Sequence, residues 1–543
     1  MPDLDADPRL GLVSQSWRAK GRLRVPMGTT DIPLEQRRET LEYDLSGAGG
    51  HMAIVGGPLS GKSTALRTLV MALSLTHTPQ EVQFYIIDLG GGTFSAFADA
   101  PHIAGVATRD TPDVLNRMLA EIESIIVDRE RYFRANRIDS ISTYRQGRAE
   151  GRFDDGYGDV FLVVDGWAIL RSDFEDLDMR IQAMLPRALS FGVHLIVATS
   201  RWMDMRQQVR DVMGSKLELR LGDVTDSEVN RKVAATVPEG RPGRGLEMGG
   251  HHVLVALPRA DGDHDVSSMS AGITATLERI AKAAPAPGPK LRLLPERITV
   301  EEVQQLEGAQ DREGLLLGVE ESRLGPWVFD PAHESHLYLY GDSKSGKTTF
   351  LRTVAREIMR TSTPKQAQIF LVDYRRTLLG EVPEEYLAGY MTTRDDATAT
   401  INDLAEYLRT RLPSDSVTTE QLRNRSWWQG AEAWLLVDDY DLVATQSGNP
   451  LIALQPLLAQ AVDVGLHVIV SRRMGGASRA AFEPVLQALS ELGTTGLMLS
   501  GSPDEGAVIG RIKPKRLVAG RAQIVSRDAG LVMGQLAWTD PIA

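Results

Sequence analysis

The chain has 543 residues, of which 42% are hydrophobic and 24% charged, an ordinary composition for a globular protein of two to four domains. It has no cysteine, which excludes disulfides, thiolate catalysis and cysteine-ligated zinc. The formal net charge of −12 counts against DNA as the main partner, because nucleic-acid motors usually carry a basic face.

The beginning of the chain does not read as a targeting signal. Residues 1–5 are acidic where a signal peptide is basic and then apolar, and no stretch approaches 18 uninterrupted apolar residues. We therefore expect a cytoplasmic protein, or the cytoplasmic portion of something larger. Residues 1 to about 25 predict a polar lead-in, and residues 23–45 predict an extended segment.

A glycine-rich loop lies between an apolar run at residues 51–55 and a helical pattern at residues 64–73. It fits Gly-x4-Gly-Lys-[Ser/Thr], and the order strand, loop, helix is the context of a phosphate site. Backbone N–H groups would hold the phosphates, Lys62 would neutralise the β and γ phosphates, and Ser63 would ligate Mg²⁺. The predicted nucleotide-binding residues are Gly56, Gly57, Pro58, Leu59, Ser60, Gly61, Lys62, Ser63 and Thr64.

A second copy of this loop argues against a chance match. Lys62 and Lys347 are separated by the same number of positions as Asp88 and Asp373, each of which ends an apolar strand. The chain is therefore predicted to be one module written twice. The second set of nucleotide-binding residues, in which Thr348 takes the Mg²⁺ position, is Gly341, Asp342, Ser343, Lys344, Ser345, Gly346, Lys347, Thr348 and Thr349.

Two features follow the strand that ends at Asp88. The triple glycine at residues 90–92 predicts either the border of a ligand crevice or only a tight turn. From Asp113, apolar residues spaced by three and four predict a long helix with a basic end at residues 129–134. This end suits a helix carboxyl terminus, and the alternative is an arginine that reaches a neighbour's nucleotide.

A continuous apolar run at residues 160–165 ends in Asp165. Its counterpart in the second half, at residues 434–438, ends in Asp438. This is the pattern of a buried parallel strand whose last carboxylate faces the phosphate loop. We expect Asp165 and Asp438 to complete the two Mg²⁺ sites. The second copy is shorter between Asp395 and Asp438 than the first copy is between the matching positions, which predicts a deletion in an external loop.

The run of alanine and proline around residues 281–295 predicts a stiff, extended linker. The expected organisation is a first module with its lead-in at 1–284, a linker and short helix at 285–310, and a second module at 311–543. A capping box at residues 299–302 is expected to open the short helix.

Two smaller features have a structural and a functional interpretation. Trp427-Trp428 predicts core or interface packing, with peptide binding as the alternative. The densest basic cluster, at residues 513–516, predicts a solvated turn rather than a contact to a nucleic-acid backbone.

The motifs occur in a specific order that covers nearly the whole chain. The order is the phosphate loop, the strand ending at Asp88, residues 101–110, the helix with residues 129–132, the strand ending at Asp165 and residues 192–201. In this order the chain resembles the FtsK/SpoIIIE motor ATPases, and its second half repeats most of the set. Residues 47–51 and 88–92 look more like the EccC branch, the ATPase of the type VII (ESX) secretion system, than like a DNA translocase.

The resemblance implies an α/β fold of two tandem RecA-like P-loop NTPase modules, each with a parallel sheet and an additional strand. It implies ATP and Mg²⁺ as cofactors, hexameric assembly, and a match to the second and third of three ATPase modules. The implied partners are an Esx-type substrate, recognised by its carboxyl-terminal signal in the last module, and the membrane-embedded part of the secretion ATPase. The implied location is cytoplasmic and peripheral to an inner-membrane secretion complex.

Both modules depart from a working motor at the residue that activates water. In active members of this family a glutamate follows the strand-ending aspartate, whereas Gly166 follows Asp165 and Asp439 follows Asp438. Asp439 is one methylene shorter than glutamate and is the possible catalytic residue. Because a positioned general base contributes roughly 10² to 10⁴ in rate, we hypothesise that both modules bind ATP and hydrolyse it slowly or not at all.

Further substitutions affect the expected sensing of the γ-phosphate. Ser200 stands where the motors have glutamine, and the second copy reads Ser-Arg-Arg-Met at residues 471–474. We therefore expect γ-phosphate sensing to be impaired in both modules. Asp173 or Glu175 is the alternative source of the missing acid.

Two other functions remain as alternatives. An ATP-driven DNA translocase would need a basic track and usually a DNA-reading domain after the motor, and the sequence ends at Ala543 with no such addition. An unrelated P-loop enzyme such as a kinase would need a further catalytic signature, which we do not find.

Overall fold

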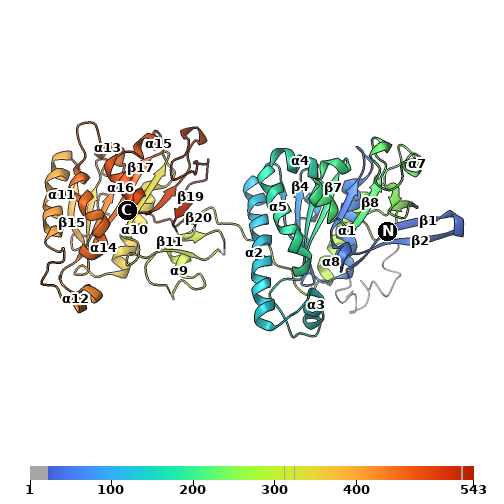
Figure 1. Ribbon diagram of the computed structural model, residues 1–543, viewed down its shortest axis with the longest axis horizontal. Helices are drawn as coiled ribbons and strands as arrows, with labels where there is room; N and C mark the ends of the chain where they lie inside the picture. Colours follow the sequence, from blue (N-terminus) through green and yellow to red (C-terminus); the bar gives the residue numbers. More distant parts are fainter. Residues whose placement is uncertain (1–22, 311, 323, 528–529, 543) are drawn as a thin grey trace. The chain divides into compact units, whose positions relative to one another are not determined.

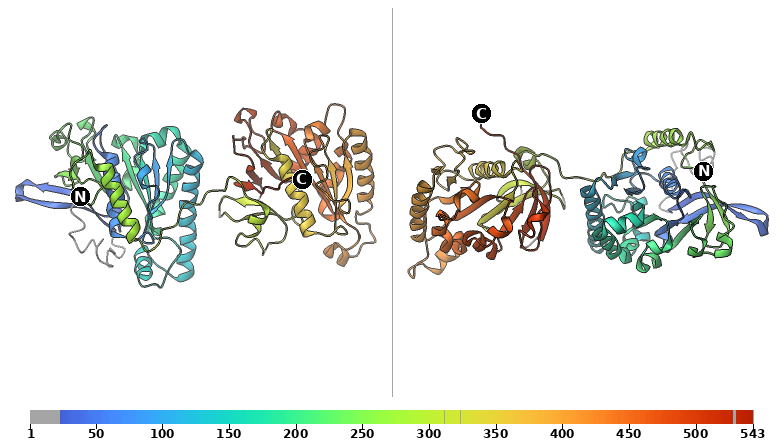
Figure 2. Two further views of the ribbon diagram at one scale, coloured as in Figure 1. Left: turned by 180° about the vertical axis from the view of Figure 1, so that it is seen from behind. Right: turned by 90° about the horizontal axis from the view of Figure 1, so that it is seen from above.

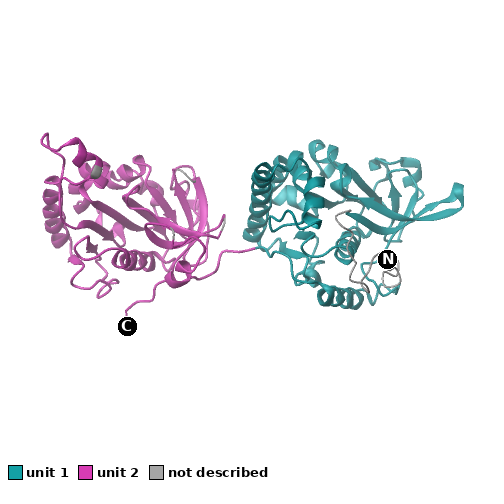
Figure 3. Ribbon diagram, turned by 90° about the horizontal axis from the view of Figure 1, so that it is seen from below, with its two compact units in different colours: residues 1–291 teal, residues 292–543 magenta. Residues whose placement is uncertain are grey.

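The computed structural model describes residues 23–310, 312–322, 324–527 and 530–542, so most of the predicted lead-in lies outside the described residues. The chain divides into two compact units, Met1–Leu291 (unit 1) and Arg292–Ala543 (unit 2), which Figure 3 shows in different colours. Within the described ranges, no helix has the length and apolar character needed to cross a membrane.

Unit 1 is built on a ten-stranded sheet in the order β2-β1-β10-β9-β8-β3-β7-β6-β4-β5 (Figure 1). The strands from β8 to β5 in this order pair in parallel, as predicted, whereas β2, β1, β10 and β9 add an unpredicted antiparallel extension. The strands are β1 (Arg24–Ile32), β2 (Arg37–Asp44), β3 (Met52–Val55), β4 (Val82–Asp88), β5 (Ile103–Thr108), β6 (Asp159–Asp165), β7 (Val193–Thr199), β8 (Ser215–Leu219), β9 (Arg244–Glu247) and β10 (His252–Val255).

Helices cover both faces of the parallel part. The side chains of α1 and α8 belong to the core on one face, and those of α2, α4 and α5 belong to the core on the other. Within β4, Phe84 and Ile86 lie in the first core and Tyr85 and Ile87 in the second, which is why this strand reads as a continuous apolar run. The helices are α1 (Lys62–Thr76), α2 (Pro112–Asn136), α3 (Ile141–Ala149), α4 (Trp167–Asp173), α5 (Glu175–Ala188), α6 (Gln207–Asp211), α7 (Arg231–Ala234) and α8 (Met269–Ala283).

Unit 2 repeats this plan in the order β12-β11-β20-β19-β18-β13-β17-β16-β14-β15. Its strands are β11 (Leu315–Glu320), β12 (Pro326–Phe329), β13 (His336–Gly341), β14 (Ala367–Val372), β15 (Leu387–Met391), β16 (Glu432–Val437), β17 (Leu466–Arg473), β18 (Thr495–Met498), β19 (Arg521–Ser526) and β20 (Gly530–Leu536). Its helices are α9 (Val300–Gln304), α10 (Lys347–Thr361), α11 (Arg394–Arg409), α12 (Thr419–Asn424), α13 (Tyr440–Val443), α14 (Ala461–Val464), α15 (Ala477–Ala480) and α16 (Pro484–Glu491).

The predicted extended segment at residues 23–45 is the antiparallel hairpin of β1 and β2. Figure 2 shows it projecting from the sheet of unit 1, and Leu34 near its tip is 99% exposed. The hairpin joins the sheet through β10, so residues near the start of the described chain pair with residues near its middle.

We predicted that the second copy is shorter because it lacks part of an external loop, and this prediction was wrong in part. The long helix is itself shorter in unit 2, because α2 has 25 residues and α11 has 16. The segments that lead from these helices to the acidic strands also differ, with α3 in unit 1 and the shorter α12 in unit 2.

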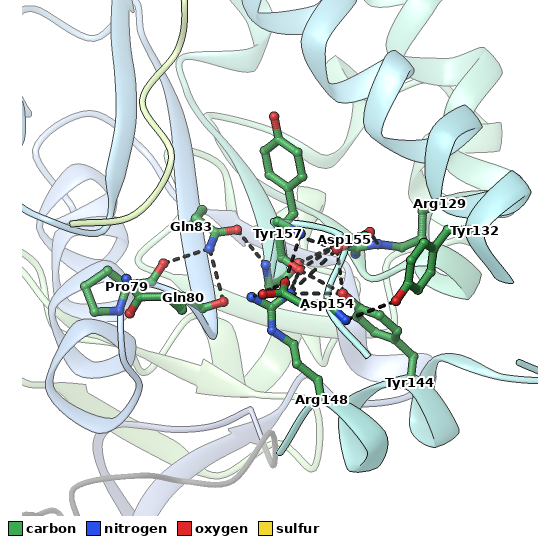
Figure 4. A network of polar contacts seen from close by, with 12 residues as sticks. Pro79, Gln80, Gln83, Arg129, Tyr132, Tyr144, Arg148, Asp154, Asp155 and Tyr157 are labelled. Carbon is green, nitrogen blue, oxygen red and sulfur yellow. Dashed lines mark hydrogen bonds and ion pairs between the residues drawn. The ribbon is translucent and has the colours of Figure 1, made fainter. Parts of the chain in front are cut away.

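The basic end of α2 contains a buried arginine. Arg129 is 1% exposed and donates hydrogen bonds to the Asp155 carboxylate and the Tyr157 carbonyl (Figure 4). It also donates to the carbonyl oxygens of Phe191 and Gly158. Burial raises the pKa of Asp155, but the hydrogen bond and charge of Arg129, together with hydrogen bonds from the Tyr144 hydroxyl and the Tyr157 amide, hold that pKa below its usual range. Arg129 therefore fixes the chain that leads into β6, and it is not available to a neighbour's nucleotide.

Arg411 in unit 2, like Arg129 in unit 1, donates hydrogen bonds to backbone carbonyl oxygens. It donates to the carbonyl oxygens of Val464 and Ala431, and its guanidinium lies 4.0 Å from the ring centroid of Trp428. The indole of Trp427 donates to the Arg411 carbonyl. The tryptophan pair thus packs against its own unit, in agreement with the structural interpretation.

The predicted linker is bound to unit 1 over part of its length. The Gly288 amide donates to the Pro101 carbonyl at 2.9 Å, and the Leu291 amide donates to the Ala104 carbonyl of β5 at 2.8 Å. Lys290 adds hydrogen bonds from its ammonium to the carbonyls of Ala100 and Ile103. The capping box that opens α9 is present as predicted.

Buried histidines make stability depend on pH. Burial lowers the pKa of His51, His102 and His336 to about 4, against about 6.5 in an unfolded chain. Between these values the unfolded chain binds a proton that the folded chain does not, so the free energy of unfolding falls as the pH falls. We expect the melting temperature to decrease from pH 7 to pH 4.5, with about 1.4 kcal/mol lost per pH unit for each histidine.

Differential scanning calorimetry over this range measures the effect. In a His336→Asn variant the pH dependence of unit 2 should become shallower, while that of unit 1 is retained through His51 and His102. A melting temperature that is constant between pH 7 and pH 4.5 contradicts the assignment.

Candidate functional site

Each predicted phosphate loop lies at the carboxyl end of the strand in the middle of its parallel sheet. β3 is flanked by β7 and β8, and β13 by β17 and β18. The Gly57 amide donates to the Arg220 carbonyl after β8, and the Asp342 amide donates to the Ser500 carbonyl after β18. The neighbouring strands therefore hold both loops in the same way.

The loops contain left-handed backbone where the sequence repeat places it. Leu59 and Lys344 have φ of 57° and 63°, and the glycines that cap α1 and α10, Gly61 and Gly346, have φ of 101° and 112°. Such a conformation is strained for non-glycine residues and persists where the surroundings impose it, as in loops whose N–H groups converge on an anion. A side chain at position 61 would also meet the backbone of Gly243 at 2.9 Å.

The loop lysines point back into their own loops. The Lys62 ammonium donates to the Gly57 carbonyl at 2.8 Å, and the Lys347 ammonium donates to the Asp342 carbonyl at 3.2 Å. Burial lowers the pKa of Lys62, and the Asp165 carboxylate opposes this change. A partly buried ammonium in a ring of backbone dipoles is suited to bind phosphate oxygens.

In unit 1 the carboxylate that ends β6 lies beside the loop. The Ser63 hydroxyl hydrogen-bonds to Asp165, and the Thr93 hydroxyl donates to Asp165 at 3.3 Å. Burial and the nearby Asp88 raise the pKa of Asp165. A hydroxyl and a carboxylate in this arrangement are the hard oxygen ligands that Mg²⁺ prefers.

In unit 2 the same arrangement is closer and has one more donor. The Thr348 hydroxyl donates to Asp438 at 2.8 Å, the Thr377 hydroxyl at 3.0 Å and the Ser471 hydroxyl at 2.6 Å. The structure therefore brings the predicted pairs, Ser63 with Asp165 and Thr348 with Asp438, into contact. These residues fit a Mg²⁺ ion bound with a nucleotide, and such an ion would neutralise phosphate charge.

Asp439, the possible catalytic residue, is engaged in ion pairs. Its carboxylate lies 2.9 Å from Nε of Arg375 and 3.9 Å from Nζ of Lys347, and its backbone has a left-handed φ of 47°. Burial and the adjacent Asp438 raise its pKa. A carboxylate held between two cations is poorly placed to take a proton from water, because its lone pairs are already directed at positive charge.

The alternative acids of unit 1 have other partners. Asp173 pairs with Arg109 at 2.5 Å, and Glu175 pairs with Arg206 at 3.4 Å. The carboxylates of Asp165 and Asp204 oppose the lowering of the Lys62 pKa by burial. Asp204 accepts hydrogen bonds from the Thr199 hydroxyl and the Arg201 amide. Sequence reasoning missed Asp204.

The triple glycine of unit 1 is a turn at the edge of the site. The Asp88 carboxylate accepts hydrogen bonds from the amides of Gly90 and Phe94, which closes the turn. A side chain at position 90 would meet the Asp165 carboxylate at 2.9 Å, whereas positions 91 and 92 face open space. The structure therefore shows the tight turn, which lies beside the Asp165 carboxylate, and the ligand crevice stays a prediction.

A threonine that sequence reasoning missed links the two carboxylates in each unit. Thr93 contacts Asp88 and Asp165, and Thr377 contacts Asp373 and Asp438. A signal existed in the sequence, because both threonines follow their strand-ending aspartates within five residues. The matching was obscured by a one-residue difference in loop length.

The fold and the two sites define a tandem P-loop ATPase of the RecA-like α/β class. The model of the FtsK/SpoIIIE family matches residues 11–261 and 300–518. Among curated proteins, the chain is 44% identical over 542 residues to the ESX-4 secretion system protein EccC4 of Mycobacterium tuberculosis, covering 100% of this chain and 43% of that protein. It is 39% identical over 555 residues to the ESX-1 secretion system protein EccCb1 of Mycolicibacterium smegmatis, covering 99% of this chain and 93% of that protein.

Solved structures agree with these relatives. A structure of Thermomonospora curvata EccC containing ATPases 2 and 3, in complex with a signal sequence peptide, is 43% identical. It superposes with a TM-score of 0.86 over 97% of this chain and 95% of that chain. The chain belongs to the FtsK/SpoIIIE family, within its ESX EccC ATPases, and corresponds to their ATPase 2 and 3 region.

The match to full-length relatives is partial. The chain spans about two fifths of the EccC proteins of T. curvata and M. tuberculosis, with 41% and 43% of their lengths covered.

Proposed function

We propose that the chain is an ATP-binding regulatory component of a type VII secretion ATPase, and that unit 2 recognises the carboxyl-terminal signal of an Esx-type substrate. Both units hold Mg·ATP and hydrolyse it slowly or not at all. The proposal on ATP rests on the two loops with their hydroxyl and carboxylate pairs, and on Gly166 and the ion-paired Asp439 in the position of the general base.

One observation carries the peptide part of the proposal. β5 and β15 are the last strands of their sheets, and each contains an Ala-Gly pair, Ala104-Gly105 and Ala388-Gly389. In unit 1 the linker lies against this pair, since the Leu291 amide donates to Ala104 and the Leu291 side chain lies 3.2 Å from the Cβ position of Gly105.

In the described part of unit 2, no chain segment is hydrogen-bonded along the outer edge of the equivalent strand, and the side chains of Phe370 and Thr400 lie 3.3 Å from the Cβ position of Gly389. Within the described ranges β15 is hydrogen-bonded to β14 alone among the strands, and its residues Leu387 to Tyr390 are partly or fully exposed. An extended peptide that adds to an exposed edge gains main-chain hydrogen bonds, and a pocket for an alternate side chain gives specificity. We place the substrate signal on β15, with an apolar side chain above Gly389.

A Gly389→Leu variant of the full chain tests this placement. The added side chain would occupy the space above Gly389, and we expect the affinity for a synthetic carboxyl-terminal signal peptide of an Esx-type substrate to fall by about tenfold or more. Fluorescence anisotropy with a labelled peptide measures it. The matched control is Ala332→Leu, which places the same leucine side chain at an exposed turn after β12, at the other edge of the sheet. Equal peptide affinity in the two variants would remove β15 as the site.

Assembly and location complete the proposal. We place the chain in the cytoplasm, peripheral to the inner-membrane secretion complex, in contact with the membrane-embedded part of the ATPase and in a hexamer when activated. Substrate binding at unit 2 promotes this multimerisation. We do not propose DNA translocation, because the net charge of −12 opposes binding to a phosphate backbone.

A further inference from the structure

The two units differ in the loop that follows the strand-ending Asp88 or Asp373. In unit 1 this loop is the triple glycine, whereas in unit 2 the corresponding residues are Arg375 and Arg376. The threonines Thr93 and Thr377 anchor the far ends of the loops to equivalent carboxylates, so the loops occupy the same place in the two sites. Two positive charges therefore stand in unit 2 where unit 1 has none.

Arg375 lies within reach of the phosphate loop. Its Nε is 2.9 Å from Oδ2 of Asp439, and Oδ1 of the same carboxylate is 3.9 Å from the Lys347 ammonium. One carboxylate thus stands between the loop lysine and a guanidinium. The Arg375 side chain is 53% exposed, so packing does not hold it in place and the ion pair with Asp439 determines its direction.

We infer that Arg375 is a γ-phosphate-binding residue of unit 2, supplied by the same chain, and that Asp439 holds it in position until a triphosphate binds. This inference rests on the proposed ATP site. The Lys347 ammonium would contact the β and γ phosphates of a bound nucleotide. A guanidinium beside it can donate two parallel hydrogen bonds to phosphate oxygens, which an ammonium cannot do. A terminal phosphate carries more charge than the single Asp439 carboxylate, so it competes for both cations.

The consequence is a difference in nucleotide preference between the units. Unit 2 discriminates a triphosphate from a diphosphate through Arg375, and unit 1 lacks this contact because glycines occupy the loop. Asp439, at the position of the general base, acts here as the partner of Arg375. Asp439, which replaces the glutamate needed for hydrolysis, thereby positions Arg375 to detect the third phosphate.

The test uses the full chain with Lys62→Ala, which removes the nucleotide site of unit 1, stripped of bound nucleotide before use. Isothermal titration calorimetry gives the affinities for Mg·ATP and Mg·ADP. Adding Arg375→Ala is expected to weaken Mg·ATP by about 10- to 100-fold, as for the loss of a charge-assisted hydrogen bond, and to change Mg·ADP by less than about twofold. Arg375→Gln serves as the second variant, and melting temperatures of all variants verify folding.

Arg376→Ala is the matched control, because it removes the adjacent exposed arginine and is expected to leave the ratio of ATP to ADP affinity unchanged. Asp439→Asn should strengthen Mg·ATP, since it removes a negative charge from the site. Equal losses for ATP and ADP with Arg375→Ala, or no loss for either, would overturn the role of Arg375 while leaving the ATP site in place. A Lys62→Ala chain that binds neither nucleotide would overturn the site of unit 2 and the role of Arg375 together.

Discussion

Replacing Lys62 by alanine is expected to empty unit 1 of nucleotide and leave unit 2 filled, and Lys347→Ala is expected to do the reverse. Each ammonium faces its loop, and its loss removes the main cation that would face the β and γ phosphates. We expect the affinity for ATP at the altered site to fall by about 100-fold or more. Chromatography of nucleotide released by denaturation, from protein purified without added ATP, gives the amount bound per chain and separates ATP from ADP.

The controls are exposed lysines outside the sites, Lys282→Ala in unit 1 and Lys365→Ala in unit 2, which should retain full nucleotide content. The released nucleotide of the unaltered chain should be the triphosphate, because Gly166 has no side chain and the Asp439 carboxylate is held in ion pairs. If the isolated chain hydrolysed ATP at roughly 1 to 100 per second, the rate of working phosphoryl-transfer enzymes, this part of the proposal would be refuted. Full nucleotide content in both lysine variants would refute the sites themselves.

Replacing Arg129 by methionine is expected to destabilise unit 1 by about 3 kcal/mol or more. The change leaves the Asp155 carboxylate, whose side chain is 10% exposed, without its closest cation, and it removes the Arg129 donors to the carbonyls of Phe191 and Gly158. The Tyr157 carbonyl loses one donor but keeps the Tyr144 hydroxyl and Arg148. Arg148, 3.6 Å from Asp155, offsets part of the loss. In a unit of this size the melting temperature of unit 1 should fall by roughly 6 to 12 °C.

Calorimetry or urea unfolding resolves the effect if unit 2 is followed in the same scan as an internal reference. The matched control is Arg131→Ala on the same helix, whose exposed pair with Asp128 is expected to contribute less than about 1 kcal/mol. A double variant, Arg129→Met with Asp155→Leu, should recover part of the stability, because the buried charge is removed with its partner. An Arg129→Met chain as stable as the control would contradict the assigned role.

The parallel half of each sheet was predictable because its signals are local. The strands ending at Asp88 and Asp165 are buried on both faces and read as continuous apolar runs, and the glycine loops need a fixed local spacing. The antiparallel half was not predictable, since β1 pairs with β10 through contacts such as Thr30 with Val253. Alternation along a strand shows which face is buried, but it does not name a partner more than two hundred residues away.

The motif residues of the candidate site could be predicted from the sequence, whereas the contacts among their side chains could not. Ser63, Thr348 and the two strand-ending carboxylates belong to motifs, and the structure brings them together as expected. Thr377 and Arg375 act through contacts between side chains on separate loops, and those contacts follow from loop length and direction. Asp439 illustrates the difference, because its identity suggested a base and its neighbours show an ion-paired carboxylate.

The linker on β5 has a consequence for the solubility of fragments. An uncovered outermost strand presents unpaired amides and carbonyls that invite chains to associate edge to edge, and proteins commonly blunt such strands with a covering segment. A fragment of unit 1 that stopped before Gly288 would lose this cover and become prone to self-association, whereas a fragment that continued through Leu291 would keep it. The few residues after α8 thus cover the edge strand against self-association, in addition to connecting the two units.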